Sequence, residues 1–368
     1  MHLENVSAEN FRNLNGRIEC AGGLNIIHGE NGIGKTNWLE AIYLLSSAKS
    51  FRTARLTEAV RFGESLAIVR GNVRRSEEIV RTLQVTINGN TKQLTVNDKK
   101  ETSARYMTEL NSILFNSEQL EIVRGTPAAR RTFLDDGIVA IFPPYIQTLA
   151  DYRQVVKQKN SLLQTARDKE YKLDALAALL EPWNDQLVAL AGVINKARQR
   201  YVERLGRCLA TSLFEREQLS IRYASSLEGK GDMSDYNALL RERLALRLEA
   251  ELYNGRALIG PHRDELEIAF DGRDIRKFGS SGQQRSALLL LLLAQLTVYF
   301  EQNNEYPLVL LDDIDAELDY ARIGKLLEYL ENKSQTFVTT SKESFIERFG
   351  ANKNRIGLSR QVEIQSPS

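Results

Sequence analysis

The stretch LNIIHGENGIGKT, residues 24–36, decides the fold class. An apolar strand over residues 24–28 leads into a glycine-rich turn that ends in Gly34-Lys35-Thr36, and a helix is expected to begin near Asn37. This order matches the P-loop pattern, in which glycines let backbone N–H groups face a phosphate and the helix N-terminus adds a favourable dipole. A glycine-rich turn beside a surface lysine is the alternative, and the flanking strand and helix argue against it.

The P-loop pattern assigns roles to individual side chains. Lys35 is expected to contact the β- and γ-phosphates of a nucleoside triphosphate, and the Thr36 hydroxyl is expected to complete the shell of a Mg²⁺ ion. The predicted nucleotide-binding residues of this segment are Gly29, Glu30, Asn31, Gly32, Ile33, Gly34, Lys35, Thr36 and Asn37. ATP and Mg²⁺ are therefore the predicted ligands.

Two acids follow an apolar segment near the other end of the chain. Residues 307–313 read PLVLLDD, and such continuous hydrophobicity is typical of a central parallel strand that is covered on both faces. Open α/β sheets bind ligands at the carboxyl edge, so Asp312 is expected near the P-loop, where it would hold Mg²⁺. Asp313 would orient or deprotonate the attacking water, which makes Lys35, Asp312 and Asp313 the predicted catalytic residues. Taken alone, acids after a strand are ordinary helix-capping or turn residues.

A third motif, GSSGQQR at residues 279–285, precedes an apolar helix that begins near Ala287. Small residues at a helix N-terminus can aim a hydroxyl and backbone amides at a phosphate, although a Ser/Gly turn there is more often only a cap. Its place about thirty residues before Asp312 resembles the signature of the ABC ATPases, usually Leu-Ser-Gly-Gly-Gln. In that family the signature of one subunit closes over the γ-phosphate on the P-loop of another. The resemblance implies a head-to-tail dimer with two ATP molecules, in which Ser280, Gly282 and Gln283 contact nucleotide.

The chain departs from the usual ABC form in three places. Gly279 stands in place of the leading Leu, and Ser281 stands in place of the first signature glycine. Asp313 occupies the position where most ABC proteins have a catalytic Glu. Because aspartate is shorter and reaches less far toward water, slow hydrolysis is expected.

The bulk composition is that of a globular protein of roughly two domains by length. The 368 residues are 42% hydrophobic, which is enough for a substantial core, and the net charge of +1 gives no global basic signature. Two cysteines and three histidines fit no metal-ligand spacing, so we predict no structural zinc and a cytoplasmic location. No secretory signal is expected, and the longest apolar run, residues 287–300, is short for a membrane span.

The texture of the sequence changes twice along the chain. The first part alternates short apolar strands with turns and contains one helix, expected at residues 37–48. Residues 145–252 are helix-compatible, with Pro182 expected in the first turn of a helix, and turn-bounded strands return after Gly255. We predict an α/β ATPase head with an inserted helical arm. The predicted boundaries are 1–124 for the N-terminal lobe of the head, 125–254 for the arm and 255–368 for the C-terminal lobe.

Seven short segments, which follow one another over nearly the whole chain, resemble a narrower family within the ABC ATPases. They are Phe11-Arg12-Asn13, the P-loop with Asn37-x-x-Glu40-Ala41-Ile42-Tyr43, Lys49-Ser50-Phe51-Arg52-Thr53, Arg130-Arg131-x-Phe133-Leu134-Asp135, Gly260-Pro261-His262-Arg263-Asp264, Ser280-x-Gly282-Gln283 and Asp312-Asp313-x-x-x-Glu317-Leu318-Asp319. Together they resemble the RecF family, the bacterial DNA-gap repair members of the ABC ATPases that are related to SMC proteins. The segment at residues 260–264 is specific to this family, unlike the generic P-loop.

This resemblance implies an SMC-like head with a helical arm, ATP-dependent dimerisation on double-stranded DNA near single-strand gaps and stalled forks, and weak DNA-stimulated hydrolysis. It also implies cooperation with RecR and RecO in loading RecA during recombinational repair and the SOS response. None of these partners follows from spacing or composition. The family usually has Ser where this chain has Ala316, so one contact across the dimer is expected to differ.

Three further positions take candidate roles from their place in the chain. Gln119, with its neighbour Glu118, lies where related ATPases have a γ-phosphate sensor loop, and simple loop structure is the alternative. Thr340, with Thr339 before it, occupies the place of the ABC switch histidine and is a candidate contact to the γ-phosphate or water. Arg12 is by resemblance a candidate phosphate contact, and an exposed arginine is the alternative.

Two basic stretches are candidates for DNA contact. Residues 49–75 hold seven basic side chains against two acids, and such a patch neutralises phosphates without reading sequence. The predicted DNA-binding residues in it are Arg52, Arg55, Arg61, Arg70 and Arg74. The second stretch contains Lys196, Arg198, Arg200, Arg204 and Arg207. Charge runs on helices are usually solvated faces, and the family resemblance favours the first stretch.

Two other classes of function share these motifs. The engine subunit of a membrane transporter has the same three motifs but usually carries the standard signature, a catalytic Glu and a switch His, all of which this chain lacks. The second class is a nonhydrolytic scaffold that binds nucleotide only for assembly. This alternative stays open because Asp313 replaces the usual catalytic Glu. The leading hypothesis is an ATP-switched DNA clamp. The preferred DNA structure, the affinity of the dimer and the surface that binds RecR do not follow from the sequence.

Overall fold

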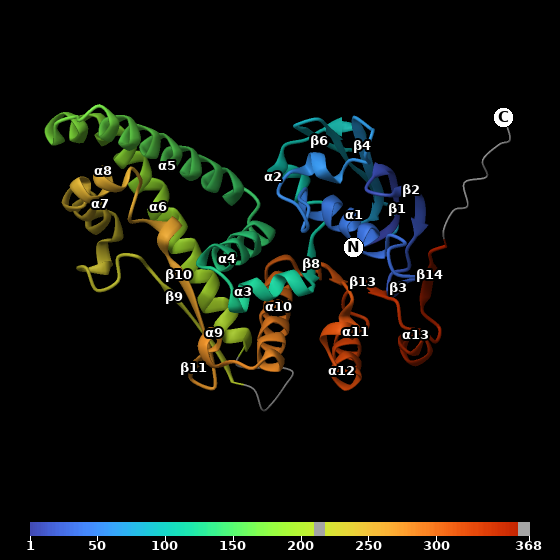
Figure 1. Ribbon diagram of the computed structural model, residues 1–368. Helices are drawn as coiled ribbons and strands as arrows, with labels where there is room; N and C mark the ends of the chain where they lie inside the picture. Colours follow the sequence, from blue (N-terminus) through green and yellow to red (C-terminus); the bar gives the residue numbers. More distant parts are fainter. Residues whose placement is uncertain (210–217, 360–368) are drawn as a thin grey trace. The chain divides into compact units, whose positions relative to one another are not determined.

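Strand β3 (Leu24–His28), which leads into the P-loop, lies inside a five-stranded parallel sheet in the computed structural model of the chain, which describes residues 1–209 and 218–359. The strand order is β14-β3-β13-β12-β8, and every pairing is parallel (Figure 1). The other strands are β8 (Ser112–Phe115), β12 (Leu308–Leu311), β13 (Thr336–Thr340) and β14 (Asn354–Gly357). All four residues of β12 are buried, as its continuous hydrophobicity predicts.

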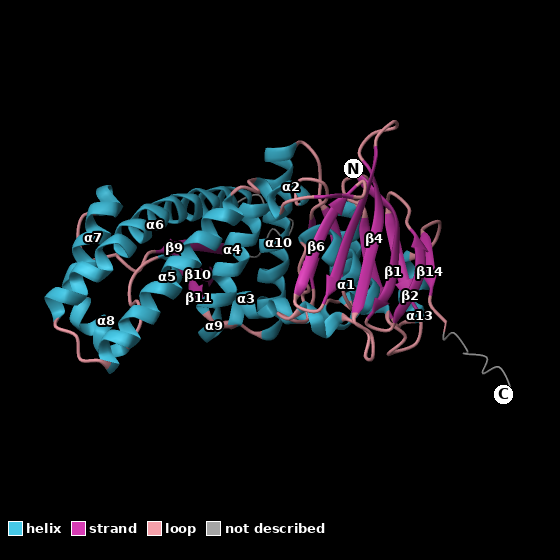
Figure 2. Cartoon of the chain, turned by 90° about the horizontal axis from the view of Figure 1, so that it is seen from above, coloured by secondary structure: helices cyan, strands magenta, loops and turns pink. Residues whose placement is uncertain are grey.

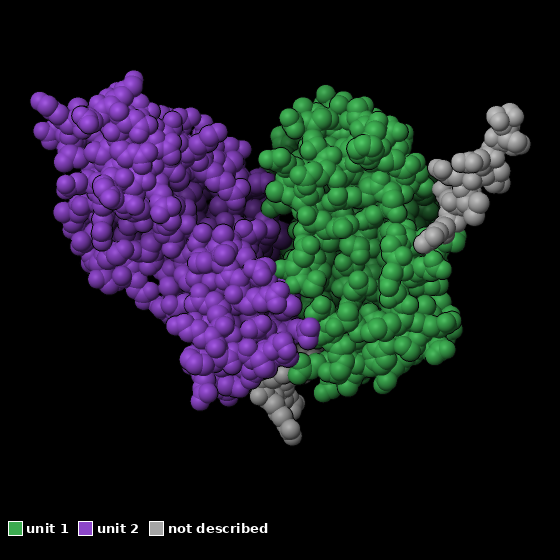
Figure 3. Space-filling view, viewed as in Figure 1, with its two compact units in different colours: residues 1–119, 295–368 green, residues 120–294 purple. Residues whose placement is uncertain are grey.

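The chain forms two units, which Figure 3 shows in different colours. Unit 1 comprises residues 1–119 and 295–368, and unit 2 comprises residues 120–294. The sequence places residues 255–294 with the head, whereas the structure assigns them to unit 2. The reason is strand pairing, because β10 (Glu265–Phe270) pairs over its full length with β9 (Leu219–Ala224) of the predicted arm.

Unit 1 contains a second sheet, which is antiparallel and has the order β2-β1-β4-β5-β6-β7 (Figure 2). Helix α1 (Lys35–Ser47) contacts β1 and β4 of this sheet and β8 and β13 of the parallel sheet, so it packs between the two. The strands are β1 (His2–Phe11), β2 (Leu14–Glu19), β4 (Leu66–Arg74), β5 (Val80–Asn88), β6 (Thr91–Val96) and β7 (Lys99–Lys100). The predicted strand-rich character and the predicted helix of this region are confirmed.

Shorter helices complete unit 1. They are η1 (Leu56–Ala59), α2 (Ser103–Tyr106), η2 (Ser117–Leu120), α11 (Ile314–Glu317), α12 (Tyr320–Leu330) and α13 (Glu343–Phe349). Helix α12 begins where the side chain of Asp319 accepts hydrogen bonds from the N–H groups of Ala321 and Arg322, an N-cap that satisfies two otherwise unpaired donors. Helix α10 (Ser281–Asn303) begins in unit 2 and ends in unit 1.

Unit 2 is mainly helical, as the sequence predicts for residues 145–252. Its two long helices, α5 (Tyr145–Asp168) and α6 (Leu173–Leu209), pack together through an apolar cluster of Leu163, Ala166, Leu176 and Leu180. The other elements are α3 (Glu121–Arg124), α4 (Pro127–Ile141), η3 (Met233–Asp235), α7 (Tyr236–Leu246), α8 (Leu248–Asn254), η4 (Pro261–Arg263), β11 (Arg273–Asp274) and α9 (Ile275–Phe278).

The prediction for Pro182 is wrong, because this residue lies inside α6 and not in the first turn of a helix. Proline lacks the N–H of a helical hydrogen bond, and its ring crowds the preceding turn, at a cost of about 3 kcal/mol. Buried side chains hold α6 on both sides of it, namely Leu176 and Leu180 before the proline and Leu187 and Ala191 after it. Tertiary packing therefore overrides the local preference.

Candidate nucleotide-binding site

The P-loop connects β3 to α1, as predicted, and three of its glycines have positive φ angles. A Cβ atom at Gly34 would lie 2.9 Å from Oδ1 of Asn13, and one at Gly29 would lie 2.7 Å from the backbone oxygen of Leu358. Side chains at these two positions would be strained and crowded at once. The turn therefore needs glycine where its backbone is to come close to phosphate oxygens.

Lys35 and Thr36 are the first residues of α1, and their side chains contact the loop and the acid after β12. The Nζ atom of Lys35 donates to the carbonyl oxygens of Gly29 and Glu30, both at 2.9 Å, so the buried ammonium group is held inside the loop. Oγ1 of Thr36 donates to Oδ1 of Asp312 at 3.0 Å. The P-loop and the acid after β12 thus meet, although they are far apart in sequence.

Two consecutive acids emerge at the carboxyl end of β12, and Thr339 links them. Oγ1 of Thr339 donates to Oδ1 of Asp312 at 2.7 Å and accepts from the backbone N–H of Asp313 at 2.9 Å. Asp313 has a φ of 46°, a left-handed conformation that is strained for a residue with a side chain, and the residue reaches the surface while its carboxyl group is half-buried beside Asp312. Such strain is typical of functional positions.

The hydroxyl of Thr340 has a different partner. It donates to Oδ2 of Asp315 at 3.0 Å, and Lys342 donates to the backbone oxygen of Asp315 at 2.7 Å. Thr339 is therefore the strand residue that contacts Asp312 in the structure. A contact from Thr340 to nucleotide or water stays a prediction.

The electrostatics of the two acids fit a cation site. Burial raises the pKa of Asp312, while hydrogen bonds from Thr339 and Thr36 oppose that effect. Burial also raises the pKa of Asp313, and the charge of Asp312 adds to it. Neither carboxylate is fully compensated by the protein alone, which is a feature of sites that take a cation.

The donor set matches Mg²⁺ held together with a phosphate. The described residues contain no group of three or more His, Cys, Asp or Glu side chains that could hold a metal by themselves. Magnesium is usually held by one or two protein oxygens plus water and substrate phosphates. The hydroxyl of Thr36 and the carboxylate of Asp312 are oxygens of that kind, so the residues present fit the ion.

A buried acid, Glu40, organises the basic residues beside the P-loop, and sequence reasoning missed this role. The carboxylate accepts two hydrogen bonds from Arg12, at 3.0 and 2.8 Å, and one from the hydroxyl of Ser50 at 2.6 Å. Arg52 lies 3.9 Å from the same carboxylate and donates to Oδ1 of Asn37 at 2.7 Å. The guanidinium of Arg12 is thus positioned by Glu40, and a phosphate contact of Arg12 stays a prediction.

Replacing Glu40 with glutamine is expected to lower the free energy of unfolding by about 3 kcal/mol, because an amide leaves a part-buried guanidinium uncompensated. Glu40 is fully buried, whereas Glu19 is mostly exposed in its ion pair with Arg17. Urea unfolding of the two variants checks this, with an expected change below about 1 kcal/mol for Glu19→Gln. Equal losses in the two variants would contradict the role assigned to Glu40.

Gln119 supplies an orphaned polar atom in unit 1. Its backbone N–H donates to Oδ1 of Asn116 at 3.0 Å, but its own side-chain Oε1 is buried without a hydrogen-bond partner. Buried acceptors are nearly always paired, so the unpaired Oε1 agrees with the predicted sensor role of Gln119, which stays a prediction. Its neighbour Glu118 is exposed.

The signature segment forms the N-terminus of α10. The N–H of Ser280 donates to Oε1 of Gln283 at 2.9 Å, and the N–H of Gln283 donates to Oγ of Ser280 at 3.3 Å, which is a reciprocal capping box. Ser280, Ser281 and Gly282 are exposed. The motif therefore does serve as a helix cap, and it remains accessible to another molecule.

The predicted DNA-binding arginines differ in their surroundings. Arg70 forms an ion pair with Asp98 at 3.2 Å, and Arg74 forms one with Glu4 at 2.5 Å. The guanidinium groups of Arg55 and Arg61 have no such partner in residues 1–209 and 218–359. Within the second basic stretch, Arg198 is buried, so the expectation that it faces DNA is wrong.

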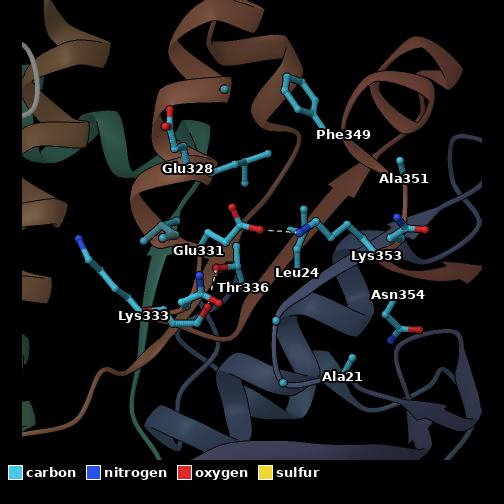
Figure 4. A pocket seen from close by; sticks show the side chains of 18 of the residues that line it. Ala21, Leu24, Glu328, Glu331, Lys333, Thr336, Phe349, Ala351, Lys353 and Asn354 are labelled. Carbon is cyan, nitrogen blue, oxygen red and sulfur yellow. Dashed lines mark hydrogen bonds and ion pairs between the residues drawn. The ribbon is translucent and has the colours of Figure 1, made fainter.

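A cavity of about 670 Å³ in unit 1 lies at the opposite edge of the parallel sheet. Figure 4 shows Leu24 and Thr336, at the amino ends of β3 and β13, in its wall. An ion pair of 2.8 Å between Glu331 and Lys353 lies at this cavity. Since open α/β sheets bind ligands at the carboxyl ends of their strands, it is not the nucleotide site.

Comparison with known proteins agrees with this geometry. The DNA replication and repair protein RecF of Oceanobacillus iheyensis is 36% identical over 351 residues, which cover 93% of this chain and 94% of that protein. RecF of Geobacillus kaustophilus is 35% identical over 349 residues, which cover 93% of each chain. The chain belongs to the RecF family. A family model described as the RecF/RecN/SMC N-terminal domain matches residues 2–364.

The fold of this chain is similar to the solved structures of a RecF protein and of an SMC head. A structure of the recombination mediator protein RecF with ATP, from the RecFOR pathway, superposes with a TM-score of 0.85 at 32% identity and covers 93% of this chain and 92% of that one. An SMC head bound to the C-terminal winged-helix domain of ScpA matches with a TM-score of 0.55 at 17% identity, which shows the fold alone. The predicted ABC-type, SMC-like ATPase fold is confirmed. Within the described residues, no helix combines the length and the apolar character that a membrane crossing needs.

Proposed function

We propose that this chain is an ATP-hydrolysing DNA clamp, in which nucleotide closes a homodimer over duplex DNA near a single-strand gap and hydrolysis releases it. The observation that carries the proposal is the network Thr36–Asp312–Thr339–Asp313, which joins the P-loop to a second, exposed acid. An ATPase needs both a cradle for phosphates and a carboxylate facing the attacking water. The network supports both roles within one unit.

The residues divide the chemistry among them. Backbone amides of the P-loop and the ammonium group of Lys35 would hold the phosphates, and Thr36 with Asp312 would hold Mg²⁺, which neutralises charge on the transferred phosphoryl group. The carboxylate of Asp313 would orient the water and accept its proton. Gln119, Thr340 and Arg12 would contact the γ-phosphate region. Ser280, Gly282 and Gln283 would complete the site of the partner subunit.

The proposed DNA contacts centre on Arg55 and Arg61, because their guanidinium groups are not committed to an acid among the described residues. Phosphate neutralisation by arginine is independent of sequence and weakens with salt. Membership of the RecF family supports a role in repair of gaps and stalled forks with RecR and RecO, helping to load RecA. A cytoplasmic location fits that role.

Light scattering of the full chain tests the clamp. We expect a dimer with ATP and a gapped duplex, and a monomer with ADP or without nucleotide, because only the γ-phosphate would bridge a P-loop to the signature of the partner. Lys35→Met should stay monomeric under all conditions. ATP-independent dimers, or a monomer that ignores both ATP and DNA, would contradict the proposal.

A further inference from the structure

Two family motifs that the nucleotide site does not use meet in unit 2. NH1 of Arg131, from α4, donates to the backbone oxygen of Asp264 at 2.9 Å. Arg198 of α6 connects the same two segments, because it donates twice to Asp135 of α4, at 2.9 Å each, and once to the backbone oxygen of Pro261 at 2.7 Å. The segments at residues 130–135 and 260–264 therefore build one structure.

The second segment requires glycine at its start. Gly260 has a φ of 120°, and a Cβ atom there would lie 2.7 Å from the hydroxyl of Tyr152. That hydroxyl lies 2.7 Å from Nδ1 of His262, and Nε2 of the same ring lies 3.3 Å from the carbonyl oxygen of Ala257. A carbonyl oxygen only accepts, so Nε2 carries the proton and Tyr152 donates to Nδ1. Burial lowers the pKa of His262 to about 4, so the ring is neutral at pH 7.

These segments line a cavity of about 620 Å³ together with α5. This volume is within the range of sites that bind organic ligands. Leu149, Val156 and Ala128 give it apolar walls, and Tyr152 and His262 give it polar groups. The cavity lies wholly within unit 2 and is separate from the P-loop, which belongs to unit 1.

The lining of this cavity is strongly cationic. It includes Arg131, Arg153, Lys157 and Arg198 against one acid, Asp135, which already holds Arg198 in a two-fold contact. Burial lowers the pKa of Arg131, and the charge of Arg198 lowers it further, so these two guanidinium groups repel each other. Arg153 and Lys157 are exposed and are not ion-paired in the part of the chain that the structure describes.

Arg153 and Lys157 stand one helical turn apart on α5, so their side chains lie on the same face at the cavity. A guanidinium fork matches the two oxygens of a carboxylate, and the apolar walls suit a neighbouring aliphatic side chain. The glycine-rich run of backbone amides that holds a phosphate in the P-loop has no counterpart in this lining. Duplex DNA presents its phosphates on a convex surface, which would reach only the rim of a cavity.

We propose that this cavity is a docking site for an acidic peptide segment of a protein partner, with Arg153, Lys157 and Arg131 as the groups that receive its carboxylates. Binding at this site is independent of the nucleotide site. The two motifs then have a common role, since α4 and the loop at residues 260–264 fix the walls and keep Arg131 and Arg198 in place.

Fluorescence anisotropy of the full chain tests this, with a labelled peptide of alternating glutamate and leucine as the probe and its glutamine-leucine counterpart as the neutral control. The double variant R153E/K157E should bind the acidic peptide at least about tenfold more weakly than the wild type, because two attractive charges become repulsive, and a tenfold change corresponds to about 1.4 kcal/mol. The matched double variant K196E/R200E reverses two exposed charges one turn apart on α6, outside the cavity, and should bind within about twofold of the wild type.

Three outcomes would overturn the proposal. The first is a wild-type chain that binds the acidic peptide no better than the neutral one. The second is an equal loss of binding in the two double variants, which would show that binding depends on the overall charge of the arm and not on the cavity. The third is a loss of duplex DNA binding in R153E/K157E with unchanged peptide binding, which would assign the cavity to nucleic acid. All four substituted side chains are exposed, and circular dichroism of each variant shows whether the fold is kept.

Discussion

Replacing Asp313 with asparagine is expected to lower the rate of ATP hydrolysis by about 100-fold or more, because the amide cannot accept a proton from water. The affinity for ATP should stay within about twofold, since the P-loop contacts do not involve this side chain. The backbone N–H of residue 313 still donates to Thr339, so the geometry of the network is kept. Single-turnover hydrolysis and equilibrium binding of ATP measure the two quantities separately.

The pH dependence of hydrolysis provides a second readout of the same residue. Only the ionised carboxylate acts as a base, and burial together with the charge of Asp312 raises the pKa of Asp313. The rate of the wild type should therefore fall with decreasing pH, and it should begin to fall at a higher pH than an ordinary aspartate would give. In Asp313→Asn the part of this dependence that Asp313 causes should be lost, and only the fall that protonation of Asp312 causes should remain, since burial raises the pKa of Asp312 as well. An unchanged rate would leave Asp313 without a catalytic role and favour a scaffold that uses nucleotide only for assembly.

Asp312→Asn is the matched control, because it changes the neighbouring acid in the same way. Asp312 contacts Thr36, so its neutralisation is expected to raise the Mg²⁺ concentration needed for activity. Asp313→Asn should leave that requirement unchanged. The two variants thus separate a metal ligand from a general base.

The site could be predicted where local sequence determines it. The P-loop combines glycines, a lysine and a threonine in one turn. The four consecutive apolar residues of β12 indicate a central strand of the sheet. Both signals depend on neighbouring residues only. The contact between Thr36 and Asp312 then follows from the rule that ligands bind at the carboxyl edge of such a sheet.

The features that could not be predicted depend on contacts between residues that lie far apart in the sequence. Which of two consecutive threonines faces Asp312 depends on the register of β13 against β12, where Leu311 is opposite Val338 and the next step brings Thr339 beside Asp312. The burial of Arg198 depends on Asp135, which lies 63 residues earlier. Glu40 is an acid within the mostly apolar segment at residues 38–45 of α1, and the sequence shows it only as part of a family motif, because its partners Arg12 and Ser50 lie outside the helix.

The bounds of unit 2 differ from those predicted for the arm for a related reason. Residues 255–294 contain strands and a signature that resemble the rest of an ATPase head, so sequence texture assigns them to it. In the structure, however, β10 completes a sheet with β9, and α9 contacts α3 of the same unit. The local sequence pattern predicts whether a segment is a helix or a strand. Which unit the segment belongs to depends on the strands and helices that it packs against.

Replacing Ser280 with arginine is expected to abolish ATP-driven dimerisation and to lower hydrolysis by about 100-fold or more, because a bulky cation would occupy the place of the signature hydroxyl. ATP binding by the monomer should stay normal, since the P-loop of the same chain is intact. Ser280 is exposed and contacts only its own cap, so the fold should be kept. Ser234→Arg, at the first turn of another exposed helical segment, is the control and should behave as wild type.

Mixing two inactive variants distinguishes action across the dimer from action within one chain. Lys35→Met lacks a working P-loop and Ser280→Arg lacks a working signature, so a mixed dimer contains one intact composite site. If the signature acts across a head-to-tail interface, equal amounts of the two variants should recover hydrolysis up to about half of the wild-type rate, because neither variant pairs with itself and each mixed dimer has one of two sites. If the signature acts within its own chain, mixing restores nothing, and Ser280, Gly282 and Gln283 do not belong to a shared site.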